Sequence, residues 1–130
     1  MTVLVACNSS EHGKAALAAG IAEASRRSEA LAVLVLNPVA EVPVELSGLL
    51  EHLPAGMDAP VVTFRTEDTE PADAILDIQD EGGISMIVLG CQKSSEQGSW
   101  VMGTTTQRVL LDASVQVLVV KATYETPAGA

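Results

Sequence analysis

The chain has 130 residues, of which 48% are apolar, and its 17 acidic and 7 basic residues give a net charge of −10. This length predicts one domain, and because only 2% of the residues are aromatic, its core must be built from aliphatic side chains, which favours helices on a parallel sheet. The few, scattered basic residues exclude a nucleic-acid or anionic-membrane surface, where phosphate binding needs clustered Lys and Arg.

The first third of the chain predicts a strand, a helix and a second strand. Residues 2–7 (TVLVAC) are apolar and rich in β-branched side chains, which is typical of a buried parallel strand. The polar residues 8–10 favour a helix start, and the Ala-rich segment 11–27 continues as a helix with one apolar face. Residues 31–36 (LAVLVL) form the second strand, which Asn37-Pro38 ends because Pro cannot donate to a sheet.

The middle of the chain repeats this alternation less regularly. Leucines at helical spacing predict a helix over about 43–53, and residues 61–66 (VVTFRT) predict a third strand. A helix begins at Thr69-Glu70-Pro71 and ends at Gly82-Gly83, where glycines commonly stop helices. The apolar run 84–89 predicts a fourth strand.

The last third contains the most informative stretch. A polar loop is predicted from Gly90 to Gly103, followed by a short helix that begins at Thr104 and a fifth strand over 115–120. A helix start offers unpaired N–H groups and the positive end of the helix dipole, which suit a phosphate. The elements alternate as β-α-β-α-β-α-β-α-β, so we expect one open α/β domain over residues 1–122 and a tail over 123–130.

No segment predicts attachment to a membrane or export. The longest apolar runs are far shorter than the roughly 20 residues that span a bilayer, and the N-terminus enters a strand without a basic leader segment. We therefore expect a cytoplasmic protein that contacts neither membrane nor nucleic acid, in which both Cys residues are reduced.

Ligands of open α/β sheets bind beyond the carboxyl ends of the strands, where the strand order reverses, so the loops after the first and fourth strands are the candidate site. The first loop lacks the first Gly of a nucleotide-binding P-loop and has Ala15 where Ser or Thr is needed. Dinucleotide, phosphoacceptor and hydrolase motifs are also missing, and His12 and His52 have no partner at metal-ligand spacing, so both are interpreted as surface residues. The sequence thus contains no base–nucleophile set for an enzyme.

Cys7 and Cys91 each follow an apolar run at the end of a predicted strand. The first interpretation is that they are small buried apolar residues. The alternative hypothesis is a redox-sensitive pair beside the ligand site, which requires their Cα atoms to lie within about 7 Å of one another.

These segments together resemble the universal stress proteins over nearly the whole chain. Residues 3–17 (VLVACNSSEHGKAAL) are similar to the family's first strand and helix start, and residues 69–75 (TEPADAI) to its acidic-Pro-Ala-x-x-Ile helix start. Residues 86–93 and 104–121 resemble its fourth strand, last helix and last strand.

The ATP-binding members of that family carry Gly, two residues, Gly, nine residues, Gly, then Ser or Thr. Here Gly90, Lys93 and Gly103-Thr104 keep this spacing with Lys in place of the second Gly, and Asn8 replaces the Asp that contacts the nucleoside. The resemblance implies that ATP, with magnesium, binds at the point where the strand order reverses. The implied nucleotide-binding residues are Asn8 and Ser9 at the ribose, Val3 and Val35 on strands flanking the adenine, and Gly90, Lys93, Gly103, Thr104 and Thr105 at the phosphates.

The resemblance also implies a parallel sheet of strand order 3-2-1-4-5 with helices on both faces, and a homodimer that pairs the last strands, Val115 to Val120. Pairing would cover an apolar strand that otherwise forms an exposed edge. The implied role is a nucleotide-binding module in stress response or signalling, with weak ATP hydrolysis at most. The alternative is a dimeric scaffold of the same family that has lost the nucleotide and acts through protein partners.

Overall fold

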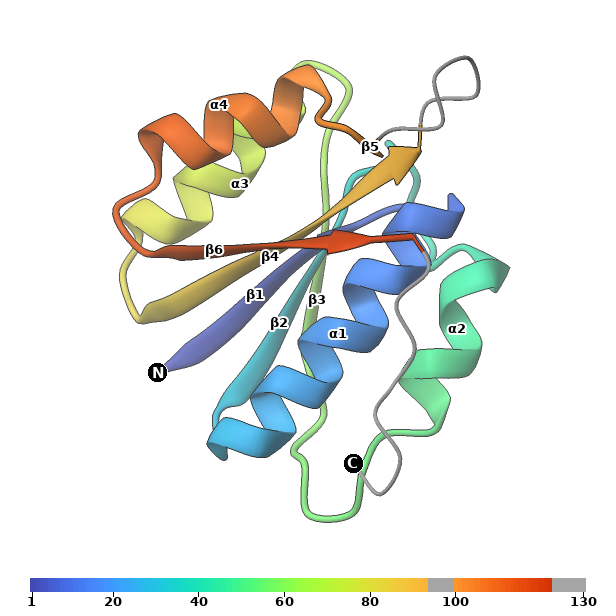
Figure 1. Cartoon of the computed structure of the whole chain (residues 1–130). Coiled ribbons are helices and arrows are strands. Elements are labelled where there is room, and N and C mark those ends of the chain that lie inside the picture. Colours follow the sequence, from blue (N-terminus) through green and yellow to red (C-terminus); the bar gives the residue numbers. More distant parts are fainter. Residues whose placement is uncertain (94–99, 123–130) are drawn as a thin grey trace.

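The computed structural model describes residues 1–93 and 100–122, which form a sheet between two layers of helices (Figure 1). The elements are β1 (Thr2–Cys7), α1 (Glu11–Arg27), β2 (Ala30–Val35), α2 (Val44–Glu51), β3 (Val61–Phe64), α3 (Pro71–Asp80), β4 (Ile84–Lys93), β5 (Trp100–Val101), α4 (Thr104–Asp112) and β6 (Gln116–Lys121). None of the helices in the described residues is long and apolar enough to cross a bilayer.

The sheet has the predicted strand order 3-2-1-4-5, in which β6 is the fifth parallel strand. β1 pairs in parallel with β2 on one side and β4 on the other, so that Val5 lies opposite both Val33 and Val88. β3 continues the sheet beyond β2, and β6 continues it beyond β4. The chain builds outward from β1 to β3 and then returns to β4, so the strand order reverses between β1 and β4.

Helices cover both faces of the sheet, which explains why its central strands are continuously apolar. Alternate side chains of β1 enter different cores: Val5 packs with α1 and α2, while Leu4 packs with α3 and α4. Because successive side chains of a strand point to opposite faces, a sheet buried on both faces needs apolar residues at every position. β1 satisfies this requirement from Val3 to Cys7, all of which are buried.

Helix α1 lies unusually close to the sheet. A Cβ atom on Gly20 would lie 1.9 Å from the Cγ2 atom of Val5, so only glycine permits this approach. The Ser10 hydroxyl caps the N-terminus of α1 by accepting a hydrogen bond from the Gly13 N–H, as the polar residues after the first strand predict. The close packing fixes the start of α1 beside the carboxyl ends of β1 and β4.

The prediction that a loop begins at Gly90 is wrong, because β4 continues to Lys93. Its parallel pairing with β6 extends to Cys91 and Lys121, and its last residues pair in an antiparallel fashion with the two-residue strand β5. Backbone pairing does not require apolar side chains where the strand emerges from the core, so the polar sequence misled the prediction. Most of the remaining predicted loop, residues 94–99, and the predicted tail 123–130 lie outside the described residues.

Candidate functional site

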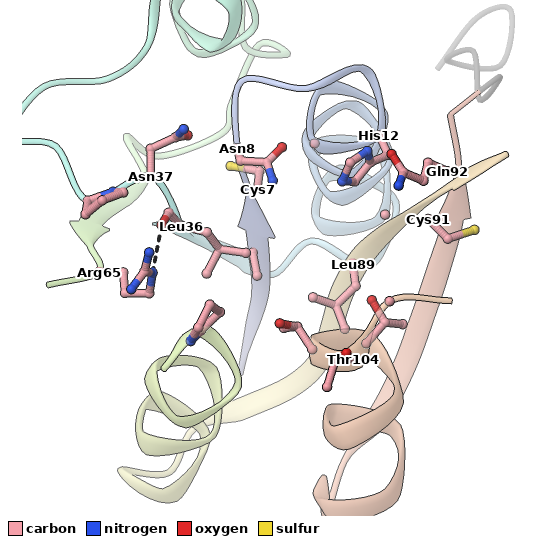
Figure 2. A pocket seen from close by; sticks show the side chains of 18 residues that line it. Cys7, Asn8, His12, Leu36, Asn37, Arg65, Leu89, Cys91, Gln92 and Thr104 are labelled. Carbon is pink, nitrogen blue, oxygen red and sulfur yellow. Dashed lines mark hydrogen bonds between the residues drawn. The ribbon is translucent and has the colours of Figure 1, made fainter. Parts of the chain in front are cut away.

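A cavity of about 530 Å³ opens at the carboxyl ends of β1, β2, β3 and β4, at the point where the strand order reverses (Figure 2). The start of α4 forms one wall and the start of α1 another. The lining residues are Ala6, Cys7, Asn8, His12, Gly13, Leu36, Asn37, Pro38, Arg65, Pro71, Leu89, Gly90, Cys91, Gln92, Gly103, Thr104, Thr105 and Thr106.

The turn after β1 holds the Asn8 side chain in one orientation. The Oδ1 atom of Asn8 accepts a hydrogen bond from the Ser10 N–H at 3.0 Å and a second from the Ser10 hydroxyl. Gly13 makes room for this turn, because a Cβ atom there would lie 2.2 Å from the Asn8 carbonyl oxygen. Because Oδ1 already accepts two hydrogen bonds, the Asn8 side chain offers a ligand mainly the N–H donors of its Nδ2 group.

His12 lies at the wall of the cavity rather than on the open surface, which corrects the sequence interpretation. Its side chain is half-buried, and one ring nitrogen lies 3.0 Å from the Ser10 hydroxyl oxygen. Burial lowers the pKa of His12 below its ordinary value, which favours the neutral ring. His52 is exposed as predicted, and its Nδ1 atom lies 2.8 Å from the Gly48 carbonyl oxygen.

The residues that follow β2 and β3 form another wall of the cavity. This wall contains Arg65, the only arginine among the described lining residues. Arg65 is half-buried, and its Nε–H donates to the Leu36 carbonyl oxygen at 2.8 Å. Its Nη1 group donates to the carbonyl oxygens of Thr69 at 2.8 Å and Thr66 at 3.2 Å. These neutral partners fix the guanidinium plane without neutralising its charge, and the described residues contain no ion pair of Arg65.

The start of α4 supplies backbone N–H groups on the opposite side. Gly103 is the N-cap residue and has no side chain to cap the helix, so the first N–H groups of α4 are left for another acceptor. A Cβ atom on Gly103 would meet nothing within 4 Å, so open space adjoins this helix end. Thr104 is exposed, and Thr105 is half-buried.

Gly90 has a packing role that the sequence did not reveal. A Cβ atom there would lie 2.1 Å from the His12 carbonyl oxygen, so only glycine lets the first turn of α1 approach β4. The residue lines the cavity, but its identity is already required by the fold.

Cys7 and Cys91 are both free cysteines, and the hypothesis of a redox-sensitive pair stays a prediction. Cys7 packs in the core on the α1 side of the sheet, and burial raises the pKa of its thiol to about 12. Cys91 follows Leu89 by two residues on the face covered by α3 and α4, so the two side chains lie on opposite faces. The interpretation of Cys7 as a small buried apolar residue is the one that the structure supports.

The electrostatic character of the cavity differs from that of the chain as a whole. Although the chain carries a net charge of −10, neither Asp nor Glu occurs among the described residues that line the cavity. The described residues also contain no cluster of His, Cys, Asp and Glu that could hold a metal ion. Hydroxyls, amides, backbone N–H groups and one guanidinium remain, and this set favours an anion.

The structure brings part of the predicted nucleotide site together. The predicted residues that line the cavity are Asn8, Gly90, Gly103, Thr104 and Thr105. Ser9 lies beside it, where its N–H donates to the Asn37 Oδ1 atom at 3.1 Å. Val3 and Val35 are fully buried in the core and do not line the cavity, and the Lys93 side chain lies outside the described part of the structure.

Comparison with known proteins identifies the fold family. The model of the universal stress protein family matches residues 1–121. The chain belongs to the universal stress protein family. A curated universal stress protein of Mycolicibacterium smegmatis is 28% identical over 127 residues, which cover 92% of this chain and 96% of the relative.

Solved structures of universal stress proteins have the same architecture. One from Archaeoglobus fulgidus is 25% identical, with a TM-score of 0.70, and the match covers 93% of this chain and 98% of that chain. The universal stress protein of A. fulgidus in complex with dAMP matches with a TM-score of 0.62 and 21% identity, over 93% of this chain and 98% of that one. At this identity, the second match demonstrates a shared fold.

Proposed function

We propose that this universal stress protein binds a nucleotide in the cavity, with the phosphates at the start of α4. The observation that carries the proposal is a cavity free of acidic side chains, among the described residues, in a chain of net charge −10. Its volume of about 530 Å³ falls within the range of small-molecule sites. The dAMP complex of a neighbour with the same fold supports the choice of ligand class.

In this proposal each part of the nucleotide has a position along the carboxyl ends of the strands. The phosphates would accept hydrogen bonds from the N–H groups of α4 and the hydroxyls of Thr104 and Thr105. Adjacent strands lie about 4.8 Å apart, so the ribose would lie at the end of β1, near Asn8, and the base beyond it at the ends of β2 and β3.

ATP is the first ligand to test, and magnesium would enter with it. Mg²⁺ is commonly held by substrate phosphates, waters and one or two carboxylates. The described lining residues contribute no carboxylate, so the fit for magnesium is limited to the hydroxyl oxygens of the threonines at the start of α4. The ion would neutralise phosphate charge, while the protein's own residues position the nucleotide.

A pair of variants tests the phosphate position. Gly103 and Gly48 both adjoin open space, but only Gly103 lines the cavity. We expect Gly103→Val to weaken ATP binding about tenfold or more in calorimetric titration, because bulk is added where the phosphates would lie. Gly48→Val, on the exposed side of α2, should leave the affinity unchanged.

The absence of any binding at millimolar ATP or AMP, with or without magnesium, would contradict the nucleotide function. Trp100 in β5 provides a second signal, because its fluorescence should respond to the ligand. If Lys93→Gly then restored binding, the lysine that replaces the second motif glycine would be the cause of the loss. If neither the unmodified chain nor the Lys93→Gly variant binds ATP or AMP, the result would favour the alternative, a scaffold that acts through protein partners.

The role in stress response or signalling and the homodimer belong to the same proposal. In the described chain β6 pairs with β4, so its other edge is available to a second copy. Pairing two β6 strands would join two sheets into one and leave both nucleotide cavities open at the carboxyl ends of their strands.

A further inference from the structure

The His12 ring at the wall of the cavity shares its hydrogen-bond partner with the turn after β1. Both ring nitrogens lie near the Ser10 hydroxyl oxygen, Nδ1 at 3.0 Å and Nε2 at 3.2 Å. The Ser10 N–H donates to the Asn8 Oδ1 atom at 3.0 Å, so that atom is an acceptor. In its own contact with the same Oδ1 atom, the Ser10 hydroxyl must therefore donate its single proton.

Toward His12, the Ser10 oxygen can consequently only accept a hydrogen bond. A hydroxyl oxygen has two acceptor lone pairs, and the Gly13 N–H takes one of them at 3.1 Å. The other lone pair can accept one ring N–H. A neutral imidazole has one N–H, whereas the protonated ring has two and needs a second acceptor. The described residues supply the ring with no second acceptor, so a ligand can take that place.

His12 lies at the end of the cavity where the phosphates of the proposed nucleotide would lie. A Cβ atom on Gly90 of β4 would lie 3.1 Å from the His12 Cβ atom, so the first turn of α1 packs directly against that strand. In chain order α4 follows β4 and β5, and Thr104 and Thr105 line the same cavity. Figure 2 shows His12 and Thr104 on the opposite side of the cavity from Arg65, which follows β3.

Without a ligand, the ring is mostly neutral at pH 7. Burial lowers the pKa of His12 because the charged ring is less well solvated at the cavity wall. The described residues contain no ion pair of His12, and the neighbouring Glu11 pairs with Lys14 at 2.9 Å. The other titratable or charged groups around the start of α1 and across the cavity are Cys7 in β1, Glu45 in α2, Arg65, Cys91 and Lys93 in β4, and Lys121 in β6. An anionic ligand would supply the missing counter-charge.

We propose that His12 is a proton-dependent phosphate contact: it takes up a proton from the solvent when a nucleotide binds and donates its second N–H to a phosphate oxygen. This inference rests on the proposed nucleotide function and adds a pH dependence to the same site. A phosphate oxygen beside the ring stabilises its charged form, so binding raises the pKa of His12. By linkage, the contribution of His12 to the affinity is absent above the pKa of the complex. It grows as the pH falls toward the pKa of the free protein.

A nuclear magnetic resonance titration of the unmodified full chain tests this coupling directly. The chain contains only two histidines, His12 and His52, and His52→Gln assigns their signals. Saturation with AMP should raise the pKa of His12, whereas adenosine, which lacks the phosphate, should not. The His52 signal is the internal control. An unchanged pKa of His12 in the AMP complex, or an equal rise with adenosine, would overturn this role while the nucleotide function stands. If AMP does not bind at any pH between about 5.5 and 8, both proposals fail.

The variant His12→Gln measures the contribution to the affinity, because glutamine keeps an N–H donor for Ser10 but takes up no proton. The affinity of the unmodified chain for AMP should exceed that of the variant about tenfold at about pH 5.5, and less than about twofold at about pH 8. The titration of the AMP phosphate itself cancels in this ratio.

His52→Gln is the matched control, because His52 is exposed and does not line the cavity. Its affinity for AMP should equal that of the unmodified chain at both pH values. A ratio for His12→Gln that does not change with pH would overturn the proposal. If His12→Gln fails to fold, the magnetic resonance titration of the unmodified chain still decides it.

Discussion

At the scale of single residues, glycine occurs at two positions of the same spacing motif for different physical reasons. At Gly90 any larger side chain would collide with the backbone of α1, so the fold itself requires glycine. At Gly103 the backbone has an ordinary φ of −70° and the neighbouring space is open. The described fold leaves room for a larger side chain at position 103, and glycine is a favourable N-cap residue there for α4.

The variants Gly90→Ala and Gly103→Ala should therefore behave differently. The Cβ atom of Gly90→Ala would lie 2.1 Å from the His12 carbonyl oxygen, and such overpacking costs about 1–3 kcal/mol of the free energy of unfolding. Gly103→Ala meets no neighbour within 4 Å and should lower the free energy of unfolding by about 1 kcal/mol or less, because alanine is a poorer N-cap residue than glycine. Urea unfolding measures both, and equal stabilities of the two variants would contradict this account of Gly90.

At the scale of elements, one side chain at the start of α1 both caps the helix and contacts residues that line the cavity. The Ser10 hydroxyl caps the helix at Gly13 and also binds the Asn8 Oδ1 atom. The same hydroxyl lies 3.0 Å from a ring nitrogen of His12. One side chain thus couples the helix end to the orientation of two residues that line the cavity.

Replacing this cap should destabilise the protein more than replacing an ordinary surface serine. Ser10→Ala removes the N-cap hydrogen bond and should lower the free energy of unfolding by about 1 kcal/mol. The control is Ser47→Ala, because the exposed Ser47 hydroxyl donates only to the Val44 carbonyl oxygen within α2. Thermal and urea denaturation compare the two, and a loss no greater than that of the control would refute the capping role.

Element types followed from local patterns, because burial on both faces makes the strands continuously apolar and caps mark the helix starts. The strand order came from the family resemblance, and it is confirmed. Part of the site followed in the same way, through Asn8, Gly103 and Thr104. Those residues lie at the end of a strand or the start of a helix. The order of the elements is therefore enough to place them at the edge of the sheet where the cavity opens.

Arg65 was missed because its place in the cavity depends on tertiary contacts. It follows β3, which pairs with β2 alone in the described part of the chain, and its orientation is set by the carbonyls of Leu36, Thr66 and Thr69. No local pattern encodes those contacts. A signal was nevertheless available: Asn37 and Arg65 each follow closely on a predicted parallel strand, whose carboxyl end faces the ligand edge of the sheet.

At the scale of the whole molecule, β6 forms one edge of the sheet and β3 forms the other. Val119 in β6 is half-buried and belongs to neither core cluster, and Val61 in β3 is exposed. Edge strands with apolar side chains are suited to pairing with another copy. The family resemblance assigns that pairing to β6 rather than β3.

Charged substitutions at the two edges therefore test the dimer. Val119→Lys should shift the protein from dimer to monomer, because it places a charge in the proposed strand pairing. Val61→Lys at the opposite edge should leave the dimer intact. Light scattering coupled to size-exclusion chromatography reports both masses, and a monomeric unmodified chain, or a Val119→Lys variant that stays dimeric, would reject this interface.

The contrast between an acidic chain and a cavity without described acidic side chains also has a kinetic consequence. An anion approaching the molecule meets repulsion from its net charge before it reaches the hydrogen-bond donors that line the cavity. Salt shortens the range of that repulsion to about 8–10 Å at physiological ionic strength. The association rate constant of a nucleotide should therefore rise with ionic strength, whereas electrostatically steered ligands slow down. Stopped-flow mixing at several salt concentrations would show whether entry, rather than retention, is the step that the protein's charge opposes.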